Sequence, residues 1–361
     1  MATSVLHILN ELNPSGAEVM LASVAEINNV HDVKGYILSI GCKRGSYSDC
    51  LQRNGYTIFY LDSSSPLLFF KLIVFFIYHR FDVIHIHTEK NFILYFLISR
   101  AFNKKIIRTY HAVFDVWGRI YGLRRKAFLK FASRLGLIGI SISRTVKNNE
   151  KSLYNNETIV ISNWINSELY NYKSSRKSPV ENNKKIKIIS VGNCDRNKNH
   201  DIILQTLKLV QIRHEDIFSR IEYVHIGEGS ETSNEVENAK SLGIDSAIKW
   251  ISSQNPLEEL IKSDIFICSS KKEGFSLATL EAYYLGLQVV VSKIAIFEKF
   301  EKEGLDLKLF DLSQEEALYN QLISLFNGKI EKVNRENHKY SLKNYLEYVK
   351  LYKSGSQGIE N

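Results

Sequence analysis

The chain has 361 residues, 44% hydrophobic and 24% charged, a balance typical of an ordered protein with about two domains rather than of a disordered chain. Its four cysteines show no close pairing and no His–Cys cluster along the sequence, which argues against a zinc site and against a secreted disulfide framework. The net charge of +8 lies wholly in residues 1–170, which hold 20 basic and 12 acidic residues, whereas the remainder holds 27 of each. This asymmetry favours an anionic partner for the first half, with a solvated basic face as the alternative.

Short apolar segments recur along the first half, and each is followed by a segment with helical periodicity. They predict strands over residues 4–9, 34–40, 57–61, 82–87, 105–111 and 136–143. Near-continuous apolar strands that alternate with helices are typical of a parallel sheet covered on both faces. The N-terminal residues alternate like a strand and lack the pattern of a signal peptide, so we expect a cytoplasmic protein.

The first predicted strand leads into a turn that contains Ser15-Gly16-Ala17-Glu18. Ser15 and Glu18 have the spacing of a capping box, which predicts a helix beginning at this turn. Gly16 would let the backbone approach a ligand closely, because it has no side chain. A purely structural cap is the alternative.

Two further segments of the first half bear on membrane contact. Residues 66–80 are strongly apolar but shorter than the roughly 20 residues of a membrane-spanning helix, so they predict either a buried helix or one with a membrane-facing surface. Residues 115–136 favour the second interpretation, because basic amphipathic helices bind anionic membranes. The aromatic and basic residues interleaved there are Trp117, Tyr121, Phe128, Phe131, Arg119, Arg124, Arg125, Lys126, Lys130 and Arg134.

The polar segment 171–185 contains one of the four prolines and is predicted to link two domains. A second α/β series follows it, with predicted strands at 185–192, 221–227, 247–252, 264–270 and 287–292. We therefore expect two Rossmann-like doubly wound domains, residues 1–170 and 186–330, facing a central cleft. Residues 331–361 are predicted to be a C-terminal helix and tail that packs on the first domain. Open parallel sheets bind ligands at the carboxyl ends of their strands, which is where we expect the site.

The segment KKEGFSLATLEAYYLGLQVVV, residues 271–291, follows one of these strands and opens a helix with Ser276 as the predicted N-cap. The N–H groups of residues 275–277 are expected to hold an anion such as phosphate at the helix start. Glu281, about one and a half turns into the helix, could accept hydrogen bonds from a diol such as ribose. Glu273 could accept them from a sugar next to the phosphate. Two ordinary surface acids would have the same spacing, so the spacing alone leaves both interpretations open.

The complete string, E-G-F-S-L followed by L-E-A, resembles the signature of the retaining nucleotide-sugar glycosyltransferases of family 4, and the resemblance covers most of the chain. It implies an α/β fold of the GT-B type and a nucleoside diphosphate sugar as substrate, without a cofactor. It also implies that Glu281 binds the donor ribose and that Glu273 contacts the transferred sugar. The turn whose amides would hold the distal phosphate consists of Gly274, Phe275, Ser276 and Leu277.

The loop at residues 190–201 matches this family in part. Lys198 stands where the family has a lysine that neutralises the diphosphate and supports catalysis. Asn193 replaces the family arginine, and Arg196 in the same loop is expected to supply the missing positive charge.

The resemblance implies three further contacts. Gly16 lies in a loop similar to the family's glycine-rich loop near the donor phosphates, and Gly227 lies in a turn near the base and diphosphate. His111, at a strand end, is implied as a catalytic residue close to the transferred sugar. A histidine on an apolar strand is more often a core residue, and this applies to His111 and even more to His85 and His87.

We therefore expect a glycosyltransferase that moves a sugar, with retention, from a nucleoside diphosphate sugar to a glycan acceptor. The acceptor is expected to be lipid-linked and to belong to a bacterial surface polysaccharide. The alternatives are another nucleotide-sugar enzyme of the same fold, such as an epimerase, and a non-catalytic sugar-binding module. No Asp-x-Asp motif occurs, so no metal is expected. The basic N-terminal domain predicts an anionic membrane surface as partner, at the inner face of the plasma membrane, and no RNA-binding motif suggests nucleic acid.

Overall fold

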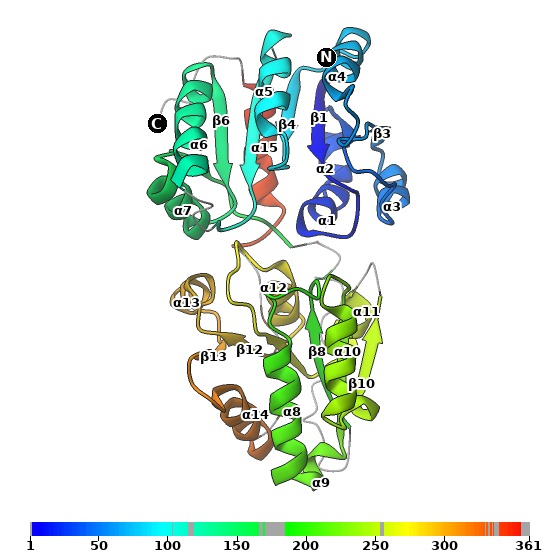
Figure 1. Cartoon of the computed structure of the whole chain (residues 1–361), viewed down its shortest axis with the longest axis vertical. Coiled ribbons are helices and arrows are strands. Elements are labelled where there is room, and N and C mark those ends of the chain that lie inside the picture. The colour runs from blue at the N-terminus through cyan, green and yellow to red at the C-terminus, as the bar shows by residue number, and fades with distance from the viewer. Residues whose placement is uncertain are drawn as a thin grey trace. The chain divides into compact units, whose positions relative to one another are not determined.

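A computed structural model of the chain describes residues 2–102, 104–114, 119–165, 169, 185–252, 256–328, 330, 333, 335 and 339–354 (Figure 1). Two compact units divide the chain. The first consists of Met1–Asn166 and Lys339–Asn361, and the second of Ser167–His338. The predicted linker, residues 171–185, lies outside the described residues except for Lys185.

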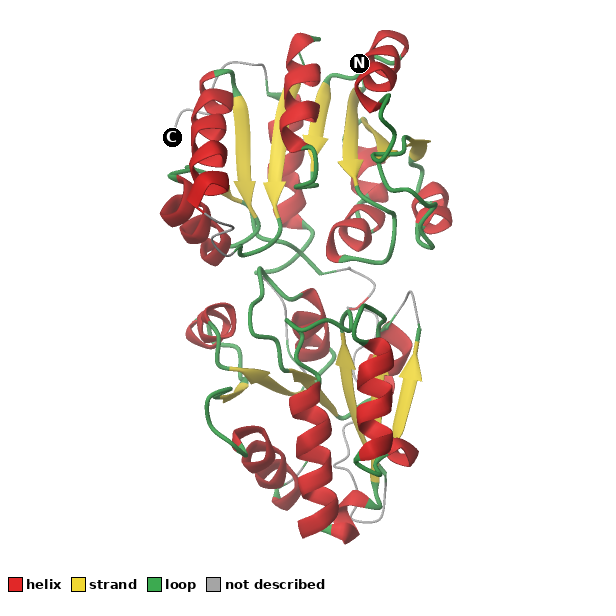
Figure 2. Cartoon of the chain, viewed as in Figure 1, coloured by secondary structure: helices red, strands yellow, loops and turns green. Residues whose placement is uncertain are grey.

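A parallel sheet with helices on both faces forms the first unit (Figure 2). Its strands are β1 (Thr3–Leu9), β2 (Val33–Ser39), β3 (Thr57–Tyr60), β4 (Val83–Ile86), β5 (Lys105–Tyr110), β6 (Leu137–Ser141) and β7 (Ile159–Val160). Its helices are α1 (Gly16–Ala22), α2 (Ala25–Val30), α3 (Ser48–Arg53), α4 (Leu68–Tyr78), α5 (Phe92–Ala101), α6 (Arg119–Arg134), α7 (Arg144–Tyr154) and α15 (Lys343–Lys353). Within the described residues the sheet has seven strands in the order β3-β2-β1-β4-β5-β6-β7. β1 lies between β2 and β4, where Val5 pairs with both Gly35 and Val83.

All six strands predicted for this unit are confirmed, with boundaries that agree within two residues. The reason is burial: β4, for example, has no exposed residue, because helices cover both faces of the sheet. β7 was not predicted, since two residues are too short to show a period.

The closing helix α15 packs on the first unit, although it is last in the sequence. The Tyr345 hydroxyl donates to Asn28 Oδ1 at 2.6 Å, and the Tyr352 hydroxyl lies 2.8 Å from His85 Nδ1. Buried tyrosines need such partners for their hydroxyls. These contacts fix the helix on the face of the sheet opposite α5 and α6 (Figure 1).

A parallel sheet also forms the second unit, with six strands among the described residues in the order β10-β9-β8-β11-β12-β13. Its strands are β8 (Ile186–Val191), β9 (Ile221–Ile226), β10 (Ile248–Ile251), β11 (Ile265–Cys268), β12 (Gln288–Ser292) and β13 (Lys308–Phe310). Its helices are α8 (Asp201–Arg213), α9 (Glu215–Phe218), α10 (Thr232–Ser241), the 3₁₀ helix η2 (Asp245–Ala247), α11 (Leu257–Lys262), α12 (Leu277–Tyr284), α13 (Ala295–Lys302) and α14 (Ala317–Asn327). The five predicted strands are present, and β13 is an addition. The two doubly wound sheets confirm the predicted fold class.

Helix α4 combines both interpretations of the apolar segment 66–80. One side is buried against the unit and consists of Leu68, Leu72, Phe75 and Phe76. The other side is exposed and mostly apolar, and carries Phe69, Phe70, Val74, Ile77 and Tyr78 together with Lys71. Among the described residues, no helix is long and apolar enough to cross a membrane.

Helix α6 departs from the predicted basic surface at one position. Arg125 is buried and forms ion pairs with Glu89 and with Glu150, whose side chain is fully buried. Its guanidinium lies 4.3 Å from the centre of the Tyr154 ring. The inclusion of Arg125 in a membrane-facing surface was therefore wrong, because a helical period places it on the inward side. Trp117 lies outside the described residues, while Arg124, Lys126, Lys130 and Arg134 are exposed.

Candidate functional site

Two loops of the second unit meet at the carboxyl ends of the neighbouring strands β8 and β11. The Lys271 N–H donates to the Asn197 carbonyl at 2.8 Å, and the Asn197 side-chain amide donates to the Lys272 carbonyl at 2.9 Å. The Ser269 hydroxyl donates to the Lys198 carbonyl at 2.8 Å. These reciprocal bonds hold the loops together at the sheet edge where open α/β sheets bind ligands.

Lys198 and Glu273 form an ion pair between these two loops. Lys198 Nζ lies 2.6 Å from Glu273 Oε1, which also accepts a hydrogen bond from the Ser270 hydroxyl at 2.7 Å. Burial by itself would lower the pKa of Lys198, but Glu273 together with the nearby Cys268 and Asp195 outweighs it, so the pKa is raised above its ordinary value. Lys198 is therefore charged at neutral pH. The structure brings together these two residues, which are 75 positions apart in the sequence.

Helix α12 begins as predicted with Ser276 at its N-cap position, but the Ser276 side chain does not form the capping hydrogen bond. Ser276 adopts a left-handed backbone conformation with φ of 65° and makes no capping bond to the helix backbone. Its hydroxyl instead lies 2.7 Å from Thr279 Oγ1. Gly274 and Phe275 are buried, and the Phe275 ring packs edge-on against Phe300. The role of this turn in phosphate binding stays a prediction.

Glu281 lies in the middle of α12, between the buried residues Leu280 and Ala282. Its side chain is partly buried, and this burial raises the pKa of its carboxyl group to about 7. Among the described residues, no hydrogen bond or ion pair satisfies the carboxylate. A partly buried acid without a protein partner is what a hydroxyl-bearing ligand would complement.

Arg196 does not join the Lys198–Glu273 pair. Its side chain is 90% exposed, and its Nε lies 3.3 Å from Glu231 Oε1. Asn193, which replaces the family arginine, is exposed in the same loop. In this conformation Lys198, rather than Arg196, therefore places a positive charge beside Glu273.

Gly227 lies where the loops after β9 and β8 approach each other. It has a φ of +144°, and a Cβ atom added to it would lie 1.9 Å from the Gly192 carbonyl oxygen. Glycine is required here by the packing of the two loops, whether or not a donor contacts them. Its predicted contact with the donor stays a prediction.

His111 in the first unit follows β5 and ends a chain of three histidines. Its Nε2 lies 3.0 Å from His87 Nδ1, and His87 Nε2 lies 3.0 Å from His7 Nδ1. Burial and the nearby Arg108 guanidinium lower the pKa of His111 to about 4, so its imidazole is neutral at neutral pH. A neutral imidazole both donates and accepts hydrogen bonds.

His85, by contrast, is a core residue. Its two ring nitrogens lie 2.8 Å from the Tyr352 hydroxyl and 2.7 Å from Thr109 Oγ1. His85, His87 and His111 line a small cavity of about 20 Å³, large enough for one water molecule. The other residues around this cavity are Ala17, Met20, Leu21, Trp164, Tyr345, Tyr348 and Tyr352.

Gly16 is exposed and is the first residue of α1, with Ser15 at the N-cap position. The predicted capping box was wrong in its bonding: Ser15 makes no side-chain capping bond, and its hydroxyl donates to the Glu18 carboxylate. Glu18 is buried, which raises the pKa of its carboxyl group to about 7. The two side chains contact each other because residues three apart at a helix start lie on the same side.

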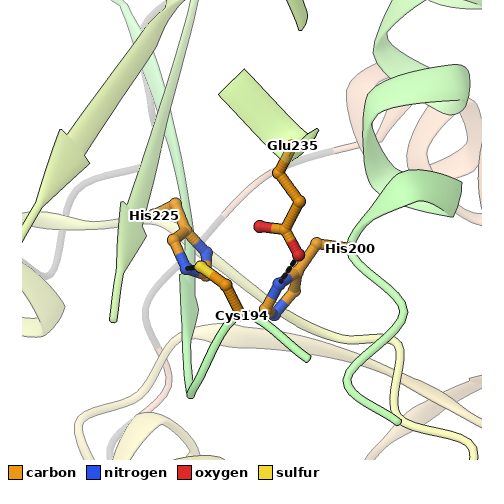
Figure 3. Close-up of side chains that lie close together, drawn as sticks. All are labelled: Cys194, His200, His225 and Glu235. Carbon is orange, nitrogen blue, oxygen red and sulfur yellow. Dashed lines mark hydrogen bonds and ion pairs between the residues drawn. The ribbon is translucent and has the colours of Figure 1, made fainter. Parts of the chain in front are cut away.

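A cluster of four potential metal ligands was missed by the sequence reasoning. Cys194, His200, His225 and Glu235 lie together in the second unit (Figure 3). The sequence contains no His–Cys cluster, but the fold places Cys194 Sγ 3.2 Å from His225 Nε2. The four residues belong to a loop, a strand and the starts of two helices, so no short spacing in the sequence reveals them.

Comparisons with known proteins match almost the whole chain to glycosyltransferase families. The family described as "Glycosyltransferase Family 4" matches residues 1–169, and the family described as "Glycosyl transferases group 1" matches residues 171–342. The capsular polysaccharide biosynthesis glycosyltransferase CapH of Staphylococcus aureus is 25% identical over 326 residues, which are 84% of this chain and 86% of CapH.

Two solved structures show the same fold over nearly full length. A glycosyltransferase from Rickettsia africae matches with a TM-score of 0.74 at 17% identity and covers 97% of this chain and 98% of its own. HepE from Anabaena, solved in complex with UDP-glucose, matches with a TM-score of 0.70 at 15% identity and covers 89% of each chain.

Proposed function

The chain belongs to the group 1 glycosyltransferases with the GT-B fold, and from this premise we propose the reaction that it performs. It transfers a sugar from a nucleoside diphosphate sugar to a hydroxyl group of a bacterial surface glycan, with retention of the anomeric configuration. The capsular role of CapH supports this type of acceptor. UDP-glucose is the first donor to test, because HepE was solved in complex with it.

The observation that carries this proposal is the state of Glu281. A partly buried carboxylate with a pKa of about 7 is costly to the fold when it is ionised and has no donor nearby. Two ribose hydroxyls would supply the missing donors. Glu281 follows Glu273 at the spacing that resembles the family signature.

Lys198 and Glu273 would act on the other end of the donor. When the sugar–phosphate bond breaks, the departing diphosphate gains negative charge, and a fixed cation nearby stabilises it. The charged Lys198 is suited to this role. Glu273 is held by Lys198 and Ser270, so its carboxylate is already oriented for a sugar hydroxyl. His111, in the first unit, would offer a neutral imidazole to the transferred sugar.

The test combines donor binding with product analysis. Thermal unfolding is followed with UDP-, GDP- and ADP-sugars, since a bound ligand raises the Tm. We expect a shift with at least one donor, reduced in Glu281→Gln and Lys198→Ala. The chosen donor is then incubated with and without a lipid-linked glycan acceptor, and NMR gives the configuration of the new linkage.

Each outcome decides between functions. A new α-linkage from an α-linked donor supports retaining transfer, and an inverted linkage contradicts it. A changed sugar formed from donor alone would show an epimerase. Binding without transfer to any acceptor would indicate a sugar-binding module, and transfer gained in Asn193→Arg would then identify Asn193 as the cause.

We further propose that the first unit binds the inner face of the plasma membrane, where a lipid-linked acceptor would lie. The support is the exposed apolar side of α4 together with the exposed basic residues of α6. Helix α5 lies between them: it contacts α4, and its Phe92 packs edge-on against Phe128 of α6. Apolar and basic side chains together favour anionic bilayers.

Vesicle sedimentation tests this proposal. The chain should bind vesicles that contain phosphatidylglycerol more strongly than neutral ones, and high salt should weaken the binding. Phe70→Ser with Ile77→Ser should reduce it, whereas Ile212→Ser, an exposed apolar residue of the second unit, should not. Equal loss in both variants, or equal binding to neutral vesicles, would contradict a specific membrane surface on α4.

A further inference from the structure

The cluster of Cys194, His200, His225 and Glu235 has the geometry of a metal site. One potential ligand atom from each residue lies within 4.8 Å of the other three. All four side chains are buried, with at most 5% exposed. Figure 3 shows the four side chains converging from separate parts of the unit.

Two of the ligand pairs lie within a few tenths of an ångström of the separation that a metal would require. Cys194 Sγ lies 3.2 Å from His225 Nε2, and His200 Nδ1 lies 3.1 Å from Glu235 Oε1. Bonds of roughly 2.0–2.3 Å to a tetrahedral ion place neighbouring ligand atoms about 3.3–3.7 Å apart. Side-chain shifts of the order of 1 Å would therefore complete the coordination.

Glu235 provides the second, independent observation. Its side chain is 95% buried, and its Oε2 makes no hydrogen bond within the part of the chain that the structure describes. A buried carboxylate oxygen without a partner costs free energy unless a cation or a donor meets it. In the structure this carboxylate lies beside two imidazoles and a thiol (Figure 3).

The surroundings of His225 also fit a ligand histidine. Its other ring nitrogen, Nδ1, lies 2.8 Å from the Ser190 hydroxyl, which lies 2.6 Å from the Tyr223 hydroxyl. Metal-binding histidines usually have their second nitrogen hydrogen-bonded in this way, which fixes the ring and the tautomer.

We propose that Cys194, His200, His225 and Glu235 bind a structural zinc ion. One thiolate, two imidazoles and one carboxylate form a set of ligands that zinc accepts in tetrahedral geometry. Four buried protein ligands leave no open position for a substrate, so the site is structural and takes no part in the sugar transfer. On binding, the Cys194 thiol loses its proton to solvent.

The zinc ion would link the loop that follows β8 to strand β9 through His225 and to helix α10 through Glu235. In this loop, Lys198 lies between the ligands Cys194 and His200. A zinc ion bound to both ligands would therefore restrain the segment that carries Lys198 at each of its ends. Loss of zinc should therefore lower the Tm of the second unit and increase hydrogen exchange in residues 192–200. The inference does not depend on the proposed donor or acceptor.

Metal analysis of the full chain tests the proposal. The protein is expressed with zinc in the medium, purified without a polyhistidine tag and analysed by elemental mass spectrometry. We expect about one zinc per chain. Substitution of cobalt should give a thiolate-to-cobalt absorption band in the near ultraviolet and strong visible bands of tetrahedral cobalt. Cys194→Ser should lose the near-ultraviolet band, and Cys268→Ser, a matched buried cysteine of the same unit, should keep it.

A second variant covers the case in which Cys194→Ser does not fold. A chain with Cys42, Cys50 and Cys268 all replaced by serine keeps Cys194 as its one cysteine, and it should keep both the zinc and the cobalt band. Three results would overturn the proposal: no metal after reconstitution under reducing conditions, cobalt bound without a thiolate band, or metal retained in Cys194→Ser but lost in His87→Ala. The last would assign the metal to the cluster of His7, His85 and His87.

Discussion

Replacing Glu281 by glutamine should stabilise the second unit at pH 8 and leave its stability at pH 4 almost unchanged. The pKa of Glu281 is about 7 in the folded chain, against an ordinary value of 4.5. Each unit of difference corresponds to about 1.4 kcal/mol, so the ionised group lowers the free energy of unfolding by ~3 kcal/mol. Between these two pH values the folded chain binds more protons than the unfolded chain. This contribution therefore lowers the stability as pH rises and reaches its full size above pH 7.

Urea unfolding measured from pH 4 to pH 8 provides the assay, with fluorescence and circular dichroism as probes. Glu281→Gln should exceed the wild type by ~3 kcal/mol at pH 8, and this excess should vanish towards pH 4. Glu258→Gln, which changes an exposed glutamate of α11, is the matched control and should give no comparable pH dependence. An excess that is constant with pH, or a variant that is less stable at pH 8, would refute the reasoning about Glu281.

The ionisation of Glu281 should also make the affinity for the donor depend on pH. If the ionised carboxylate accepts hydrogen bonds from ribose, a nucleotide sugar should bind more tightly at pH 8 than at pH 6, with release of a proton. A nucleotide sugar is the better probe than a free nucleotide, because its phosphates keep their charge over this range. Calorimetry in buffers of different ionisation enthalpy measures the proton released. A pH-independent Kd in the wild type would remove the Glu281 carboxylate from the donor site.

Three further predictions follow from particular contacts. Lys198→Ala should weaken nucleotide-sugar binding by about 10- to 100-fold, the size of a lost charge-assisted hydrogen bond, and calorimetry would contradict this if the Kd were unchanged. Gly227→Ala should lower the Tm of the second unit, because its Cβ would lie 1.9 Å from the Gly192 carbonyl oxygen; an unchanged Tm would show that the two loops separate at no cost. Glu150→Ala should destabilise the first unit by roughly 3–5 kcal/mol in urea unfolding, since it leaves the buried Arg125 charge without one partner, and a loss below ~1 kcal/mol would refute this.

The fold was largely predictable, because burial on both faces of a parallel sheet leaves a clear trace in the sequence. Segments such as VIHI of β4 and IFIC of β11 are apolar or neutral throughout, and the helices between them are periodic. The short strands β7 and β13 were missed, because two or three residues carry no period.

The candidate site was predictable where its residues lie close together in the sequence. Glu273 and Glu281 belong to one strand–turn–helix segment, so a single motif contains both. The partner of Glu273 was not predictable as a contact: Lys198 approaches it because β8 and β11 are neighbours in the sheet. Arg196, from the same loop as Lys198, contacts Glu231 instead.

The sequence by itself determined that two α/β units alternate strands with helices, and that a family-like pair of acids lies beside one helix start. Local patterns suffice for this, since backbone periodicity and turn chemistry depend on near neighbours. Only the tertiary structure decided that Arg125 is buried and that Cys194 lies among two histidines and Glu235. These contacts join residues far apart in the chain, and they form because strand order and helix packing bring the segments together.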